Sequence, residues 1–554
     1  SFRILKGGKI SLVVSSFLAG TTLSFAAPSG GVVTSGDANI SQAGKVTNIS
    51  QSTQKASINW NKFDIASDET VNFKQPNSSS ITLNRVVGNE KSIINGALNA
   101  NGQVWIINSN GVLFGKGASI NTSGLLATTK DISDADFQAG NYNFKGNSKE
   151  SVINLGTIDV INSGSVILAA NEVRNEGTIK AIRGKIHLAG ADEYTVNLNG
   201  NSLVNLTVNK GVLDSLVKNS GTIISNGGEV YLTTNAVNEL LKGVVNNTGV
   251  IEANSLAGIT GHVELFAHGG EVQVGGKLEA KEGFIETSGR DFSIDKDAKI
   301  ETAEWLIDPV DITINDTLAG AIATQLGSGN VTIETDATNI PDTSSNQSGT
   351  RGDIFVASNI NYTRTNESTL TLKAYSSVVF ADGYGGNSDS VFSTVGGINS
   401  TNAALNVVLW SRAGDTATDA NSYRKGSVWV PVGASIQTNG GDITIGGGID
   451  PLTGYSYAGA LNSAETNAIY RGVTINGLLN AEGGNISIKA EGPYSGAAGR
   501  GISIGGTIST NGSGNISIDG ISHTSSDGIG IGDSNPATIN IQNGTLTLNG
   551  TKGT

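Results

Sequence analysis

The chain has 554 residues, of which 37% are hydrophobic and 15% charged, and its formal net charge is -13. The apolar fraction supports a large ordered structure. The acidic balance argues against nucleic acid as a partner, because phosphate binding needs clustered Lys and Arg. The absence of Cys excludes disulfides, thiolate metal sites and cysteine nucleophiles, and the 75 glycines, with many Asn, Ser and Thr, favour turns and strands over helices.

Residues 1–26 have the organisation of an export signal. Three basic residues lie within the first nine, an apolar run follows over 10–23, and small residues precede Ala27. This pattern is typical of a cleaved signal peptide, and the apolar run is too short for a good membrane anchor, the alternative interpretation. We predict cleavage after Ala26. Because no later stretch has 18 consecutive apolar residues, we expect no transmembrane segment in the mature chain.

A short phrase then recurs along the chain. Asn-x-Gly-x-Ile begins at Asn154, Asn175, Asn219 and Asn247, with spacings of 21, 44 and 28 residues. Each copy is followed by a strand that opens with glycine and alternates in polarity, such as GSVILAA from Gly164, and similar strands continue to GTLTLNG from Gly544.

Repeats of short strands joined by Asn/Gly corners predict a parallel β-solenoid, in which neighbouring rungs bury each other's inner faces. Alternation directs one set of side chains inward and the other to water, and stacked corner asparagines can form ladders. The alternative, an array of β-sandwiches, would show regular two-residue hairpins and domain linkers, which we do not find.

The repeat is interrupted between Trp305 and Thr350. This region contains the one helix-like segment, Asp316 to Gly329, and a polar loop over 339–350. We place a domain boundary near residue 310 and consider, as the alternative, an insertion outside the solenoid.

Four longer stretches carry a family resemblance. They are Ile58–Phe73, Ser80–Gly88, Ile94–Thr129 and Gly283–Ile314. In these stretches the chain resembles the filamentous-haemagglutinin-type exoproteins of bacterial two-partner secretion, and is most similar to the high-molecular-weight adhesins.

The resemblance implies an all-β fold, a right-handed parallel β-helix with small extra-helical elements. It implies a secretion domain over 27–310, followed by a truncated β-helical repeat shaft over 311–554. It also implies recognition by a dedicated outer-membrane transporter, and secretion or surface display by a Gram-negative-type bacterium after passage through the periplasm. The expected role is adhesion to a receptor or glycan on host or neighbouring cells.

The family's diagnostic turn, Asn-Pro-Asn-Gly-Ile, falls by resemblance on Asn108, Ser109, Asn110, Gly111 and Val112. Ser109 replaces the proline and Val112 the isoleucine, whereas both asparagines and the glycine are retained. We predict a rung corner here. Its asparagines are expected to hold the corner rather than contact the transporter, since Asn at tight turns usually bonds nearby backbone.

A candidate cell-attachment tripeptide, Arg351-Gly352-Asp353, follows the polar loop. Some integrins recognise this sequence in their ligands. The alternative is that it leads into a strand over 354–356, because three-residue motifs recur by chance.

No pattern in the chain indicates a catalytic site, a cofactor or a metal. His187 and His262 are expected at solvent-facing strand positions, and His268 and His523 in loops, without metal-ligand spacing. The aspartates within 131–136 and near 527–533 match no calcium-binding loop.

Two alternatives to an adhesin remain open. A contact-dependent toxin carrier would have a non-repetitive effector beyond residue 554. A β-helical polysaccharide-active enzyme would bring carboxylates and a Lys or Arg together on neighbouring rungs.

Overall fold

The computed structural model describes residues 27–553 except 213, 236–242, 337–351, 384–391, 419–425, 458–470, 495–498 and 533–534. The predicted signal peptide, residues 1–26, lies outside the described residues.

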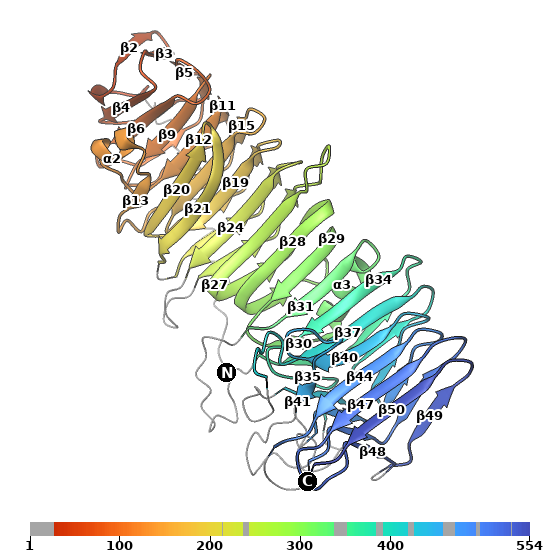
Figure 1. The fold of residues 1–554 in the computed structure, drawn as a ribbon. Helices are drawn as coiled ribbons and strands as arrows, with labels where there is room; N and C mark the ends of the chain where they lie inside the picture. Colours follow the sequence, from red (N-terminus) through yellow and green to blue (C-terminus); the bar gives the residue numbers. More distant parts are fainter. Residues whose placement is uncertain are drawn as a thin grey trace.

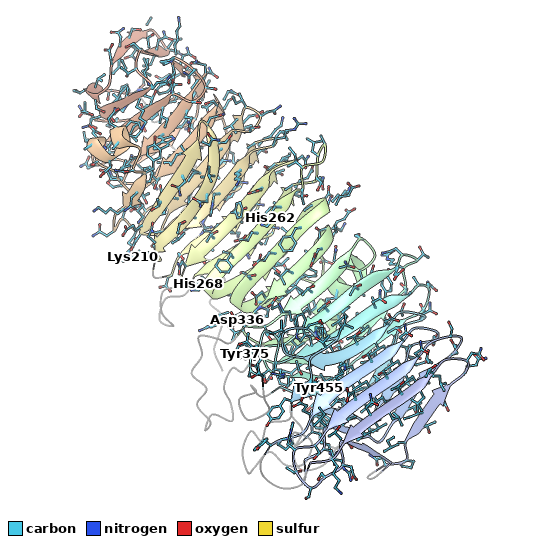
Figure 2. The ribbon with its side chains drawn as sticks, in the orientation of Figure 1. Lys210, His262, His268, Asp336, Tyr375 and Tyr455 are labelled. Atoms are coloured by element: carbon cyan, nitrogen blue, oxygen red, sulfur yellow. The ribbon has the colours of Figure 1, made fainter. Side chains whose placement is uncertain are left out.

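The chain winds into an elongated parallel β-helix (Figure 1), with polar side chains along its outside (Figure 2). Each regular rung contributes one strand to each of three faces, and strands of successive rungs pair in parallel and in register. For example, Val112 is paired with Ser92 of one neighbouring rung and Val152 of the other. The predicted fold class is confirmed.

The strands are assigned to the faces in the order in which the chain visits them. Face 1 contains β7 (Ser92–Ile94), β10 (Val112–Phe114), β14 (Ser151–Asn154), β17 (Glu172–Asn175), β22 (Leu216–Asn219), β25 (Val244–Asn247), β30 (Ile312–Ile314), β32 (Ile354–Val356), β35 (Val378–Val379), β38 (Val428–Val430), β42 (Val473–Ile475), β45 (Ile502–Ile504) and β48 (Ile529–Ile531). Face 2 contains β3 (Val46–Gln51), β5 (Thr70–Lys74), β8 (Ala97–Ala100), β11 (Ser119–Thr122), β15 (Thr157–Val160), β18 (Thr178–Lys180), β23 (Thr222–Ile224), β26 (Val250–Glu252), β33 (Asn359–Tyr362), β36 (Gly397–Ser400), β39 (Ser435–Gln437), β43 (Leu478–Asn480), β46 (Thr507–Thr510) and β49 (Thr538–Ile541). Face 3 contains β4 (Lys55–Trp60), β6 (Ile81–Val86), β9 (Gln103–Ile107), β12 (Gly124–Thr128), β16 (Ser165–Ala170), β19 (Lys185–Gly190), β24 (Glu229–Asn235), β31 (Asn330–Glu334), β34 (Ser368–Lys373), β37 (Leu405–Ser411), β40 (Ile443–Gly447), β44 (Ile486–Glu491), β47 (Ile516–Ile521) and β50 (Leu546–Thr551). Three long strands turn corners and serve more than one face: β27 (His262–Val274), β28 (Lys277–Ile294) and β29 (Lys299–Asp308).

Smaller elements lie at the end of the helix and on its surface. At the N-terminal end, β1 (Val32–Ser35) and β2 (Ala38–Ala43) pair antiparallel with β4 and β3. Outside face 3 lie α2 (Asp134–Ala139) and an antiparallel sheet in the order β13 (Asn143–Lys145), β20 (Glu193–Asn199) and β21 (Ser202–Lys210). The short β41 (Ser456–Tyr457) pairs with β44.

The predicted helix is present as α3 (Asp316–Gln325), and it lies within the solenoid and not outside it, whereas the polar loop predicted over 339–350 lies outside the described residues. Asn315 caps α3 by accepting the Leu318 N–H at 3.0 Å. In chain order α3 follows β30 on face 1 and precedes β31 on face 3, so it replaces the face 2 strand of one rung. Leu318 and Ile322 are buried in the main core, which continues without a break past residue 310. The domain boundary therefore stays a prediction.

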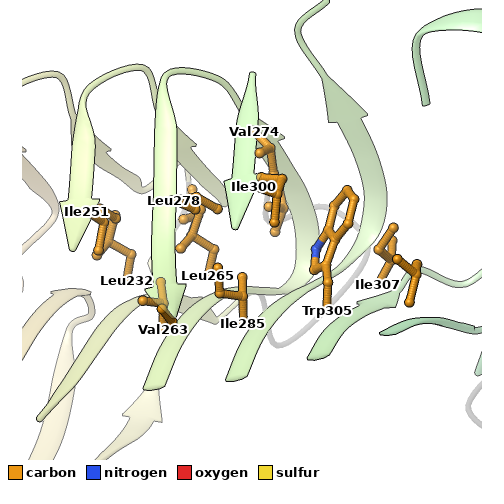
Figure 3. Close-up of a cluster of buried hydrophobic side chains, with 14 of the residues drawn as sticks. Leu232, Ile251, Val263, Leu265, Val274, Leu278, Ile285, Ile300, Trp305 and Ile307 are labelled. Carbon is orange, nitrogen blue, oxygen red and sulfur yellow. The ribbon is translucent and has the colours of Figure 1, made fainter. Parts of the chain in front are cut away.

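The interior is a continuous apolar column (Figure 3). Val263, Ile285 and Trp305 are buried on successive rungs of face 3, as are Ile251 and Leu278 on face 2. Burying one such aliphatic side chain contributes about 1.5–3 kcal/mol before conformational entropy is subtracted.

Polar ladders stabilise the corners between faces 1 and 2. Asn154, Asn175, Asn219 and Asn247 are fully buried, and each of the first three donates its side-chain N–H to the Oδ1 atom of the next at 2.8 Å. The glycine two residues after each asparagine allows close stacking, since a Cβ on Gly221 would lie 2.1 Å from the Gly177 carbonyl oxygen. The predicted asparagine ladder is confirmed.

Neither described helix is long and apolar enough to span a membrane.

Candidate functional site

The predicted secretion motif forms the corner between β9 on face 3 and β10 on face 1. The Asn108 side-chain oxygen accepts the Asn110 N–H at 2.9 Å, and the Asn108 carbonyl accepts the Gly111 N–H at 3.0 Å. Gly111 has a φ of +103°, a conformation that glycine adopts without strain. These bonds are those of a tight turn in which Ser109 occupies the second position.

The side chains of both asparagines bond to the neighbouring rung, Asn108 from a buried position and Asn110 from a partly exposed one. The Asn108 side chain is fully buried and donates to the Glu90 carbonyl at 2.9 Å and to Ser92 Oγ at 3.0 Å. The Asn110 side chain donates to the Gly88 carbonyl at 3.0 Å. Both residues therefore fasten one rung to the next.

The exposed member of the motif is Ser109, while Gly111 and Val112 are buried. The Ser109 carbonyl accepts a hydrogen bond from Ser148 Oγ at 2.6 Å. The departure from the family's proline therefore falls at the surface of the corner, where a side chain meets solvent.

A buried lysine anchors the segment that bears Ser148. Lys130 Nζ donates to the Ser148 carbonyl and to Asp192 Oδ1, both at 2.9 Å, and the Lys130 side chain is fully buried. Burial lowers the pKa of Lys130, an effect that Asp192 opposes. The ion pair ties the chain on both sides of the extra-helical sheet to the end of β12.

Charged side chains lie on the neighbouring rungs, one of which carries the Glu90 carbonyl that Asn108 binds. Lys62 and Glu90 form an ion pair at 2.6 Å with both side chains exposed, and the hydrogen bond to Glu90 raises the pKa of Lys62. Asp64 accepts the Ile93 N–H at 2.8 Å, and burial raises the pKa of its carboxyl group.

Face 3 departs from the predicted alternation at the same rungs. Trp105, Leu126 and Ile167 point outward from β9, β12 and β16, yet each is at most 2% exposed. The Trp105 ring contacts the Phe137, Tyr142 and Phe144 rings at centroid distances of 5.6, 4.9 and 5.7 Å.

The expectation that one side-chain set faces water is therefore wrong for this part of face 3. Here α2 and the sheet β13-β20-β21 cover the strands. The sequence contained a sign of this cover. In VWII and SVILAA, apolar residues occupy successive positions instead of every second one, a pattern typical of strands that are buried on both sides.

Two residues of the predicted cell-attachment tripeptide, Gly352 and Asp353, are described, and both are buried. Asp353 is 3% exposed, and its carboxylate accepts the Ser377 N–H at 3.0 Å. Its own N–H and that of Gly352 donate to Asp311 Oδ1. Arg351 lies outside the described residues. The buried carboxylate is not presented to a receptor, so these residues act as a rung corner.

Two histidine predictions are wrong. His187 is 5% exposed because β21 overhangs it, and its Nε2 lies 3.0 Å from Thr233 Oγ1. Burial is the main cause that lowers the pKa of His187 to about 3. His268 lies within β27 and not in a loop.

Within the described residues, no group of three or more His, Asp or Glu side chains is arranged to hold a metal ion. Carboxylates and a lysine do meet on face 3, where Asp308, Glu334 and Lys373 occupy successive rungs. Lys373 pairs with Glu334 at 2.6 Å and lies over the Trp410 ring. Burial, with the nearby Glu334, raises the pKa of Asp308 to about 7. This row contains the residues that the enzyme alternative requires, but Lys373 is engaged in the ion pair.

The family model described as the TPS secretion domain matches residues 24–280. Two curated relatives from Haemophilus influenzae, both named heme/hemopexin-binding protein, are 35% identical over 287 residues and 32% identical over 279 residues. These alignments cover 49% and 46% of this chain but 31% and 29% of the relatives, so the chain spans less than a third of their length. The solved HMW1 secretion domain from Haemophilus influenzae has the same fold, with a TM-score of 0.51 and 24% identity over 74% of this chain and 98% of that one.

Proposed function

Residues 24–280 are a two-partner secretion domain of the filamentous-haemagglutinin type, and from this premise we propose that the protein is an exoprotein exported through a dedicated outer-membrane transporter. In this proposal residues 1–26 direct the chain to the periplasm, and the transporter recognises the secretion domain, which we extend to residue 310. Residues 311–554 form the shaft displayed at the surface of a Gram-negative-type bacterium or released from it. The family match carries the proposal.

We propose adhesion as the role of the displayed rod. An elongated β-helix places its distal rungs far from the membrane, and its long, weakly charged surface offers repeated contacts to a receptor or glycan on another cell. The matching family is a secretion domain and not a family of enzymes.

Deleting residues 27–310 or residues 311–554 tests whether the first segment is needed for export and the second for attachment. Without residues 27–310 the chain should accumulate in the periplasm of its host, whereas without residues 311–554 it should still reach the medium or surface but lose attachment to target cells. Immunoblots of periplasm, surface and medium measure the first effect and a cell-binding assay the second. Undiminished export of the chain lacking 27–310 would remove the basis of the proposal.

The corner at Asn108 to Val112 is proposed to act in secretion through folding. Asn108→Ala should then reduce rung stability and export together, because it leaves the Glu90 carbonyl and Ser92 without their partner. Ser109→Ala is the matched control and should leave both unchanged. A stably folded Asn108→Ala protein that is not exported would instead indicate direct recognition of this side chain.

The relatives' name supports a second candidate, binding of heme or hemopexin. It is favoured by a row of stacked rings on the outside of face 3, where His187, Tyr231, His262 and Phe284 follow at centroid distances of 5.3, 5.4 and 5.3 Å. Titration of the purified chain with hemin and with hemopexin tests it. Binding of either without attachment to cells would favour this candidate over adhesion.

A further inference from the structure

The extra-helical sheet ends in an open edge beside a groove. In the order β13-β20-β21, the nine-residue β21 is the last strand. Between β21 and the outer surface of face 3 lies a groove of about 330 Å³, with Leu206 and Val208 along the wall and Tyr231, Glu264 and Phe266 along the floor. Figure 2 shows Lys210 at the end of β21, and His262 and His268 on β27.

Within the described part of the chain, no further strand pairs with the outer edge of β21, which faces this groove. Lys185 Nζ reaches up from β19 to the Val204 carbonyl at 2.9 Å, and the Asn235 side chain reaches from β24 to the Val208 carbonyl at 3.5 Å. Backbone groups of every second residue in a strand point to the same edge. The N–H and carbonyl of Leu206 therefore point to the same edge as the Val204 and Val208 carbonyls and lie between these two contacts. An edge with this spacing is a template for another strand.

The floor continues the surface that the sheet already covers. Under the sheet, the outward residues of face 3 are apolar and buried, as Trp105 and Ile167 are. One and two rungs beyond β24, Phe266 and Phe284 still point outward but are only half-buried. The sheet therefore stops short of the last aromatic rungs, and one more strand would cover them.

Ring geometry favours a peptide over a sugar as the occupant. The His187 and Tyr231 rings stack with an interplanar angle of 25°, and His262 stacks on Phe284 at 27°. The Tyr231 ring, which lines the groove, lies between the His187 and His262 rings, so the groove meets its edge, whereas a bound sugar typically stacks on an open ring face. Apolar side chains of a strand pack well against ring edges.

The charges along the floor define the peptide further. Glu229 is already engaged by Lys185 at 3.0 Å and by the Tyr231 hydroxyl at 2.6 Å. Glu264 and Glu286 follow Tyr231 in register on the next two rungs and point outward, with His262 as a neighbour 3.4 Å from Glu264. Basic side chains on the occupant would complement these carboxylates.

We propose that this groove binds an extended segment of another protein, with alternating apolar and basic side chains, which pairs with β21 as a fourth strand of the sheet. The inference rests on the proposed role as a displayed binding protein and specifies its receptor as a protein with an accessible extended segment. Main-chain pairing with Leu206, between the two side-chain contacts to β21, supplies the affinity, and contacts with Phe266 and Glu264 supply the selectivity.

The test uses the mature chain, residues 27–554, and a fluorescein-labelled octapeptide of alternating Lys and Val. Leu206→Pro removes the N–H that faces the groove and should weaken binding about tenfold or more, while Leu206→Ala, which keeps this N–H, is the matched control and should weaken it less. Phe266→Ala and Glu264→Gln test the floor independently of the edge. Bound peptide should also slow hydrogen exchange of the backbone amides of β21.

A version of the octapeptide methylated on alternate amide nitrogens distinguishes pairing from simple charge attraction. The proposal predicts that this peptide does not bind. It is overturned if the methylated peptide binds equally well, if β21 shows no added protection, or if a soluble oligosaccharide protects β21 when the peptide does not. Loss of cell attachment with peptide binding intact would contradict only the proposed adhesin function, because the peptide assay requires neither export nor cells.

Discussion

Two stretches of face 3 share one inner architecture and differ outside. On β9, β12 and β16, apolar residues point both inward and outward, and the strands are buried on both sides. On β29, β31 and β34, the inner residues are again apolar and buried, but the outward ones, such as Thr332 and Lys373, reach solvent. The rung repeat determines the inner surface of the helix, and the outer surface depends on whether another element covers it.

The largest test of this contrast compares two outward tryptophans on face 3. Trp105→Ala, under the cover, should lower the free energy of unfolding by about 3–5 kcal/mol, because a fully buried ring and its three aromatic contacts are lost. Trp410→Ala on uncovered β37, where the ring is half-buried, should cost about 1–2 kcal/mol. Urea unfolding followed by far-UV circular dichroism measures both. Equal losses would show that the cover does not stabilise its rungs.

The second comparison is between a buried asparagine ladder inside the helix and a partly exposed one on its surface. Asn219→Ala leaves a donor on Asn175 and an acceptor on Asn247 unsatisfied in the core, at a cost of about 2–4 kcal/mol. Asn99 bridges Asn72 and Asn121 in a partly exposed ladder, so Asn99→Ala should cost less than about 0.5 kcal/mol. If Asn219→Ala shifts the urea midpoint no more than Asn99→Ala does, the buried ladder does not stabilise the fold as proposed.

The pH dependence of stability should have opposite signs beneath the cover and away from it. The folded-state pKa of His187 is about 3, below its ordinary value of 6.5, so the unfolded chain binds more protons between these values and stability falls as pH drops through that window. The pKa of Asp308 is raised from 3.8 to about 7, so the folded chain holds a proton that the unfolded chain releases, and stability falls as pH rises from 4 to 7.

Melting temperatures of His187→Gln and Asp308→Asn between pH 4 and 8 measure these contributions. In His187→Gln, the melting temperature should fall less at acid pH than in the wild-type chain. In Asp308→Asn, it should fall less as the pH rises toward neutral. Each difference should be a few degrees. Parallel melting profiles of either variant and the wild-type chain would exclude the assigned residue.

The smallest effect is expected at the exposed position of the secretion motif. Ser109 occupies the second position of its turn, where proline is favoured, so Ser109→Pro should raise the free energy of unfolding by about 0.4–1 kcal/mol without changing export. Thermal unfolding and secretion are the measurements. A destabilised Ser109→Pro protein would mean that the Ser109 backbone is not in the assigned conformation.

Much of the motif's geometry could be predicted from residue types, but its partners could not. Asn108, Asn110 and Gly111 indicate a tight corner because Asn bonds local backbone and Gly adopts positive φ. That Asn108 bonds the Glu90 carbonyl depends on which rung stacks beside it, and this register involves residues 18 positions apart. The burial of Asp353 could not be predicted for the same reason, since it depends on neighbouring rungs that a local pattern does not contain.

By itself the sequence determined the solenoid, its Asn/Gly corners and the helical segment at Asp316, because these follow from strand alternation and from the conformational preferences of single residues. The tertiary structure alone decided that α3 replaces a strand, that β21 overhangs His187, and that the sheet β13-β20-β21 ends in an open edge beside the aromatic rungs. Each of these depends on packing between segments far apart in the chain, where burial and not local propensity determines the outcome.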